Sequence, residues 1–102
     1  MFFYYNQKMP SKKKTPSALK QPDHVAWRKV ENEAVLLDLK TGEYFTLNEI
    51  GSLVWERLCA GDSLAAITAR ICRDYAVKPA QADGDVQSLV DRLLKKKLLA
   101  AS

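Results

Sequence analysis

The hydrophobic pattern of the chain changes its period near residue 48. Before that point, β-branched and aromatic residues gather in three short runs, 24–30, 34–38 and 43–47. Runs of this length and composition predict β-strands. A polar break at 31–33 and a turn at 40–42 separate the runs, and Gly42 can take the positive φ that a tight turn requires. Connections this short predict an antiparallel meander.

After residue 48, apolar positions recur with the 3.6-residue period of an α-helix. A first helix is predicted from its stripe Ile50, Leu53, Val54 and Leu58. Its N-cap is either Thr46, opening a Thr46–Glu49 capping box, or Asn48. Gly61 should end it as a residue of positive φ.

Ser63 is predicted to cap a second helix, and a third helix falls within about residues 80–97. The third helix carries its apolar stripe at Val86, Leu89, Val90, Leu93 and Leu94. Leu98 and Leu99 follow it and should pack back on the core. Three amphipathic helices must bury their stripes against the sheet, so the order βββααα predicts one α+β domain. Two short helices with a tight turn, a further helix and a small sheet suggest a winged helix-turn-helix shape.

The charge of the chain is unevenly distributed. The 102 residues carry a formal net charge of +4, but residues 1–22 contribute +5 and residues 23–102 contribute −1. The first segment contains three prolines, three consecutive lysines and no apolar periodicity. We therefore expect residues 1–22 to be a disordered basic tail and residues 23–102 to be the folded domain. The basic character of the whole chain says little about what the domain binds.

The residue inventory argues against several classes of function. The chain has one histidine, His24, and two cysteines, Cys59 and Cys72, which fit no zinc motif and which we expect to be buried and reduced. No phosphate-binding glycine loop and no pair of activated nucleophile and base can be named. No stretch is long enough to cross a membrane, and the start is a poor signal peptide. We expect a cytoplasmic protein that is not an enzyme and uses no cofactor or metal. Met9 is an alternative start of the chain.

Three consecutive segments carry a likeness to a known family. They are Gly42–Gly51, which reads GEYFTLNEIG, then Val54–Glu56, then Cys59–Ser63. With Tyr75, the pair at 85–86 and the leucines near the C-terminus, this order resembles the PqqD-like family, whose namesake acts in pyrroloquinoline quinone biosynthesis. The likeness covers roughly residues 24–100 and leaves the pathway open.

The resemblance implies a peptide chaperone, also called a RiPP precursor recognition element. Such a protein binds the leader of a ribosomally made precursor peptide and presents it to a radical SAM maturase or another peptide-modifying enzyme. The leader would lie as an extra strand on the third strand, beside the third helix, and an exposed sheet edge is a template for such addition. Carried over, the peptide-binding residues are Tyr44, Phe45, Thr46, Leu47, Asp85, Leu89, Arg92, Leu93 and Lys96.

The side chains of the third strand must divide between two faces. We expect Phe45 and Leu47 to face the core, so that the backbone of the strand matters more than its side chains. Leu89 and Leu93 could equally be plain core residues, and Arg92 and Lys96 could simply be solvated.

Two alternatives stay open from the sequence. A DNA-binding winged-helix regulator fits the topology, but a domain of charge −1 fits DNA poorly, so nucleic acid is not the expected partner. The exposed strand edge could instead pair with a second copy and give a homodimer.

Overall fold

The three predicted strands form one antiparallel sheet in the computed structural model, which describes residues 19–101. They are β2 (Val25–Val30), β3 (Glu33–Asp38) and β4 (Tyr44–Leu47), in the order β2-β3-β4. Each strand lies within one residue of its predicted position. The turn before β4 includes Gly42 at φ +80°, and the Asp38 carboxylate accepts from the backbone N–H of Lys40 at 2.9 Å.

Strand register divides the side chains of the sheet between two faces. Leu36 on β3 stands opposite Trp27 on β2 and Phe45 on β4, and Ala34 stands opposite Leu47. Ala34, Leu36 and Leu47 are buried and Phe45 is half-buried, so these residues face the helices. The expectation that Phe45 and Leu47 share the core face is confirmed.

Three helices follow the sheet: α1 (Glu49–Cys59), α2 (Leu64–Tyr75) and α3 (Pro79–Lys95). Asn48 caps α1, because its side-chain oxygen accepts from the Gly51 N–H at 2.8 Å. The alternative cap, Thr46, is wrong, because that residue lies inside β4. Ser63 caps α2 as predicted, accepting from the Ala66 N–H at 3.1 Å.

The predicted end of α1 is also confirmed. Gly61 has φ +93°, and the next residue, Asp62, donates its backbone N–H to the Arg57 carbonyl at 2.9 Å. The left-handed conformation of Gly61 ends the helix, and the hydrogen bond from Asp62 to Arg57 closes its last turn. The chain then turns toward α2.

A second, two-stranded sheet was not predicted. β1 (Leu19–Lys20) pairs antiparallel with β5 (Ala100–Ala101), with Leu19 opposite Ala101. Leu19 packs against the core, and Gln21 donates its side-chain amide to the Val25 carbonyl at 2.7 Å. Residues 19–22, which we expected in the disordered tail, therefore belong to the described fold. The rest of that expectation, residues 1–18, lies outside the described residues.

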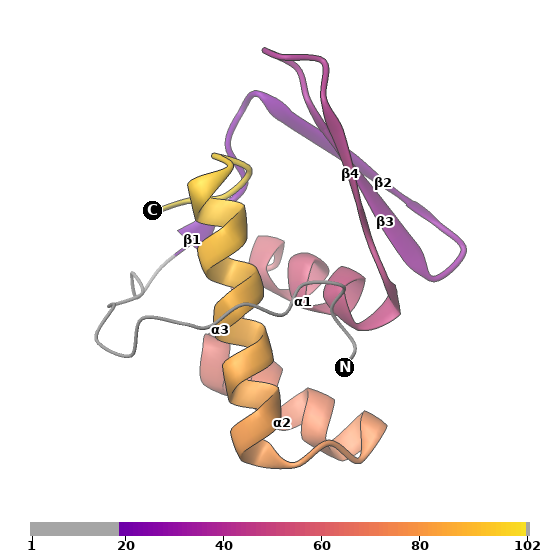
Figure 1. The fold of residues 1–102 in the computed structure, drawn as a ribbon, viewed down its shortest axis with the longest axis vertical. Helices are drawn as coiled ribbons and strands as arrows, with labels where there is room; N and C mark the ends of the chain where they lie inside the picture. Colours follow the sequence, from indigo (N-terminus) through magenta and orange to yellow (C-terminus); the bar gives the residue numbers. More distant parts are fainter. Residues whose placement is uncertain (1–18, 102) are drawn as a thin grey trace.

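Figure 1 shows the helices gathered on one side of the three-stranded sheet. One hydrophobic core joins the sheet to the helices. Trp55 of α1 is its largest fully buried side chain and meets Trp27 edge to face, with ring centroids 6.3 Å apart. Leu98 and Leu99 are buried, as predicted: the chain turns at Lys97 (φ 62°), and the Leu98 N–H donates to the Leu93 carbonyl at 2.9 Å.

These elements confirm the predicted α+β fold with a three-stranded antiparallel sheet followed by three helices. Within residues 19–101, no helix combines the length and the apolar character needed to cross a bilayer.

Candidate functional site

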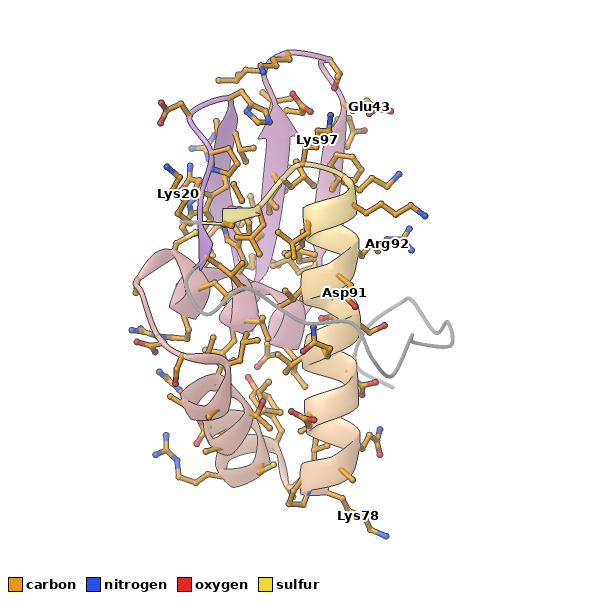
Figure 2. The ribbon with its side chains drawn as sticks, turned by 90° about the vertical axis from the view of Figure 1, so that its left-hand side faces the viewer. Lys20, Glu43, Lys78, Asp91, Arg92 and Lys97 are labelled. Carbon is orange, nitrogen blue, oxygen red and sulfur yellow. The ribbon has the colours of Figure 1, made fainter. Side chains whose placement is uncertain are left out.

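A shallow groove lies between β4 and α3. It encloses about 240 Å³, part of it open to solvent, and is lined by Phe45, Leu47, Leu89, Arg92, Leu93, Lys96 and Leu98. Figure 2 shows α3 running alongside the sheet, with Arg92 in its upper half and Lys97 just beyond its end. The groove therefore joins one edge of the sheet to the C-terminal half of the last helix.

The strand beside the groove is an edge strand. β4 pairs with β3 on one side, and no described strand pairs with its other side. An edge strand presents unpaired N–H and C=O groups along its length, which another extended chain can satisfy. A short edge next to an apolar groove is suited to adding one strand.

The groove has an apolar floor and a basic rim. Leu47, Leu89, Leu93 and Leu98 are almost fully buried, so they belong to the core as well as to the floor. Phe45 is half-buried, and the Lys96 ammonium nitrogen lies 5.7 Å from the centroid of its ring. Arg92 also lines the rim, and none of the seven lining residues is acidic.

The structure gathers six of the nine predicted site residues in this groove. They are Phe45, Leu47, Leu89, Arg92, Leu93 and Lys96. Tyr44 and Thr46 are exposed and do not line the groove, because they alternate with Phe45 and Leu47 along β4 and point to the opposite face of the sheet. Leu98 was not among the predicted site residues, although its place after the helix already indicated that it folds back.

Asp85 is the third predicted site residue that does not line the groove, after Tyr44 and Thr46. It lies on α3 seven residues before Arg92, and it is not among the lining residues. One of its carboxylate oxygens is buried without a hydrogen-bond partner in the described structure, and burial raises its pKa. Helical spacing puts Asp85 on the same side of α3 as Leu89, Arg92 and Lys96. Asp85 lies closer to the N-terminus of the helix, outside the groove.

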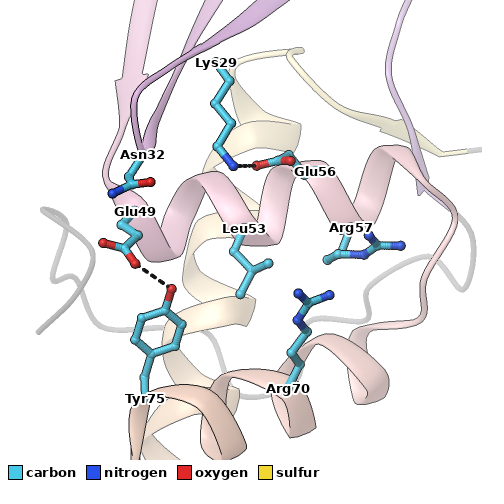
Figure 3. Close-up of a pocket in the computed structure, with 8 residues that line it drawn as sticks. All are labelled: Lys29, Asn32, Glu49, Leu53, Glu56, Arg57, Arg70 and Tyr75. Atoms are coloured by element: carbon cyan, nitrogen blue, oxygen red, sulfur yellow. Dashed lines mark hydrogen bonds and ion pairs between the residues drawn. The ribbon is translucent and has the colours of Figure 1, made fainter.

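A second, larger hollow lies between α1, α2 and the β2–β3 turn (Figure 3). It encloses about 500 Å³, part of it open, and its charged groups are paired. Lys29 bonds Glu56 at 3.0 Å, and the Tyr75 hydroxyl donates to Glu49 at 2.9 Å. Arg57 and Arg70 also line the hollow. Arg57 pairs with Asp62, just after α1, and Arg70 pairs with Asp74 on α2. The internal pairing leaves this hollow less suited to capture a ligand than the groove at β4.

No group of three or more His, Cys, Asp or Glu side chains within residues 19–101 is placed to hold a metal ion. Cys59 and Cys72 are free thiols at the edge of the core. We expected both to be buried, but both are only half-buried. Burial, and then the charge of Glu56, raise the pKa of the Cys59 thiol to about 11, which disfavours the reactive thiolate.

A protein-family model matches residues of both the sheet and the helices. The model for coenzyme PQQ synthesis protein D (PqqD) matches residues 33–99, which include β3, β4 and all three helices. The chain belongs to the PqqD family.

Two solved structures resemble this PqqD-family chain closely. One is TbiB1 in complex with the TbiA(beta) leader peptide, with 34% sequence identity, a TM-score of 0.76, and coverage of 81% of this chain and 96% of the other. The second is lasso peptide synthetase B1 complexed with the leader peptide, with 26% identity, a TM-score of 0.78, and coverage of 82% and 99%. Comparison with curated protein sequences gave no match.

Proposed function

We propose that this chain binds the leader of a ribosomally made precursor peptide and presents the peptide to a modifying enzyme. The observation that carries the proposal is the coincidence of an open strand edge and an apolar groove at β4 and α3. The two similar structures, both leader-peptide complexes, support the same function.

The leader would bind as an additional strand on β4. Its main chain would pair with the open edge, which supplies affinity without depending on sequence. Alternate side chains would enter the groove against Phe45, Leu89 and Leu93 and supply specificity. Arg92 and Lys96 at the rim would attract acidic residues of the leader.

Within this proposal the chain is an adaptor and not an enzyme, acts in the cytoplasm and needs no cofactor. Its second partner is the peptide-modifying enzyme, a radical SAM maturase or another class. The absence of acidic residues from the groove, together with its basic rim, supports a leader that is apolar and acidic.

The DNA-binding alternative is not favoured. The two exposed arginines of α2, Arg70 and Arg73, both bond to Asp74, at 3.4 Å and 2.9 Å. A phosphate backbone would have to compete with that carboxylate for both cations.

A titration of the chain with a synthetic leader of the cognate precursor, followed by amide NMR, tests the proposal. We expect one-to-one binding with the largest shifts at Tyr44–Leu47 and along 89–96, and none with a scrambled peptide of the same composition. Phe45→Ala should weaken binding at least tenfold, and Tyr44→Ala, on the other face of the strand, by less than threefold. Leader binding that leaves the β4 amides unmoved would contradict the proposed site.

A further inference from the structure

Four exposed lysines lie near the place where the first and last strands pair. β1 pairs with β5 and puts Lys20 opposite Ala100. Three consecutive lysines, Lys95–Lys97, stand at the C-terminal end of α3, just before β5, and all four side chains are exposed. Figure 2 shows Lys20 and Lys97 toward the same end of the molecule, with Lys78 at the opposite end. We call Lys20 and Lys95–Lys97 the basic end.

The basic end has no internal counter-charge within the described residues. Elsewhere on the domain, four cations form ion pairs with carboxylates at 2.7–3.4 Å: Lys29, Arg57, Arg70 and Arg73. None of the four lysines of the basic end pairs with a carboxylate within residues 19–101, and Lys96 lies over the ring of Phe45 instead. Unpaired like charges on one end of a protein create a positive potential that attracts an anionic partner.

The chain that leads into β1 adds to this charge. Residues 1–18 contain Lys8, Lys12, Lys13 and Lys14 and no acidic residue. Since the last three are only five to seven residues before Leu19, even a fully extended chain keeps them within about 25 Å of it. The charge of residues 1–22 therefore reinforces the basic end and not a remote part of the domain.

The composition of residues 1–18 indicates which anionic partner fits. Four consecutive aromatic residues, Phe2–Tyr5, precede the lysines. Aromatic side chains partition into the boundary between lipid headgroups and acyl chains, and a cluster of four to eight lysines beside them is typical of binding to anionic lipid. A nucleic-acid site favours arginines, which bond phosphates and bases in pairs, but residues 1–22 and the basic end contain lysines and no arginine.

We propose that the basic end and residues 1–18 together attach the chain to the surface of an anionic lipid bilayer. The lysines meet the anionic headgroups, and Phe2–Tyr5 enter the headgroup layer. This contact is peripheral and needs no membrane-spanning helix, and charge combined with aromatic insertion gives reversible binding. It does not rest on the proposed function, because Lys96 is the one residue of the basic end that lines the groove.

The test measures co-sedimentation of the full chain with vesicles of phosphatidylcholine, alone or mixed with anionic phosphatidylglycerol. One variant replaces Lys12, Lys13 and Lys14 with glutamine, and a second replaces Phe2–Tyr5 with serine. A third, Lys95→Gln with Lys97→Gln, removes two charges from the basic end and leaves Lys96 in place.

The matched control for the third variant is Arg28→Gln with Lys78→Gln. It removes the same charge from two exposed positions outside the basic end. Binding of DNA, single-stranded and duplex, is measured in the same buffer. Leader affinity is measured for every variant.

We expect the wild-type chain to bind the mixed vesicles at least tenfold more tightly than phosphatidylcholine alone, and added salt should reduce the difference. Each lysine near an anionic surface contributes about fivefold to affinity. The Lys12–Lys14 variant should therefore lose at least tenfold and the Lys95 and Lys97 variant at least threefold. The serine variant should lose at least tenfold, and the control should stay within twofold of wild type.

Equal binding to the two kinds of vesicle would overturn the inference, and so would a control that loses as much affinity as the Lys95 and Lys97 variant. Tighter binding to DNA than to the mixed vesicles would also overturn it and assign the basic end to nucleic acid. Leader affinity should stay within twofold of wild type in every variant. Failure of the leader to bind the wild-type chain is a separate result, which contradicts the proposed function alone.

Discussion

Lys96 lies over the ring of Phe45, with its Nζ 5.7 Å from the ring centroid. The contact joins the last turn of α3 to the edge strand and places a cation at the rim of the groove. Such a pair contributes about 0.5–1 kcal/mol at an exposed site. A peptide that enters the groove must share or displace this contact, so Lys96 is placed to influence both the affinity of the leader and its charge preference.

Replacing Lys96 with methionine should weaken binding of an acidic leader by about three- to tenfold, because the side chain keeps its length and loses its charge. The affinity should also become less sensitive to salt, since the lost attraction was partly screened. Anisotropy at two salt concentrations measures both effects. Lys95→Met is the control, because Lys95 is exposed on the same turn but does not line the groove. Equal losses in the two variants would contradict a specific role for Lys96.

The structure predicts a sharp contrast between Leu36 on β3 and Leu39, the residue just after that strand. Leu36 is fully buried and Leu39 is mostly exposed. Leu36→Ala should lower the free energy of unfolding by about 2–5 kcal/mol, because it leaves a cavity in the core. Leu39→Ala should change it by no more than about 0.5 kcal/mol. Urea denaturation followed by circular dichroism compares the two, and similar losses would argue against the register.

The cap of α1 can be tested at a single residue. Asn48→Ala should lower the free energy of unfolding by about 1 kcal/mol, because the Gly51 N–H loses its acceptor. Asn48→Asp keeps an acceptor near the helix N-terminus and should restore most of the loss. An alanine variant as stable as wild type in urea would show that the cap contributes nothing.

The Cys59 thiol should be slow to alkylate. Its pKa is raised from 9.0 to about 11, so at pH 8 the thiolate fraction falls by about a hundredfold. In a Cys72→Ser variant, the rate of reaction with iodoacetamide should stay low at pH 8 and rise up to about pH 11. The unfolded chain releases the proton first as pH rises, so the group also destabilises the fold progressively above about pH 9. A rate at pH 8 equal to that in urea would contradict this assignment.

The first described residues should contribute to stability. Leu19 packs on the core, Lys20 pairs with Ala100, and Gln21 bonds the Val25 carbonyl. A chain that begins at residue 23 should therefore unfold more easily than one that begins at residue 19, by about 1–3 kcal/mol. Thermal denaturation measures the melting temperatures of the two truncated chains. Identical values would show that β1 does not stabilise the fold.

Sequence pattern predicted the main elements because each buries a regular stripe. The strands followed from their runs of β-branched and aromatic residues and the helices from their apolar spacing. Leu47 of the third run and Val54 and Leu58 of the first helical stripe are all in the core. The pattern could not choose between Thr46 and Asn48 as the cap, since both residue types accept hydrogen bonds at a helix start. The choice depended on where pairing with β3 ends, which is a tertiary property.

The short strands β1 and β5 could not be predicted for a similar reason. Two residues carry no alternation, and Leu19 and Ala101 are 82 positions apart, so only the closed fold brings them together. The family resemblance implied Leu89, Arg92 and Lys96 as site residues, and all three line the groove beside β4. It also implied Asp85, which lies closer to the start of α3 and does not line the groove.

The pairing of Leu19 with Ala101 has a consequence for how the domain can be joined to other proteins. Both ends of the described chain leave the fold at one place, next to each other. Neighbouring ends are the condition under which a domain tolerates insertion into a host protein or circular permutation. A version with residue 101 joined to residue 19 through a short turn and new ends opened in the loop at 76–78 would keep β4 and the C-terminal half of α3 intact, and so could be inserted within a modifying enzyme as an internal module.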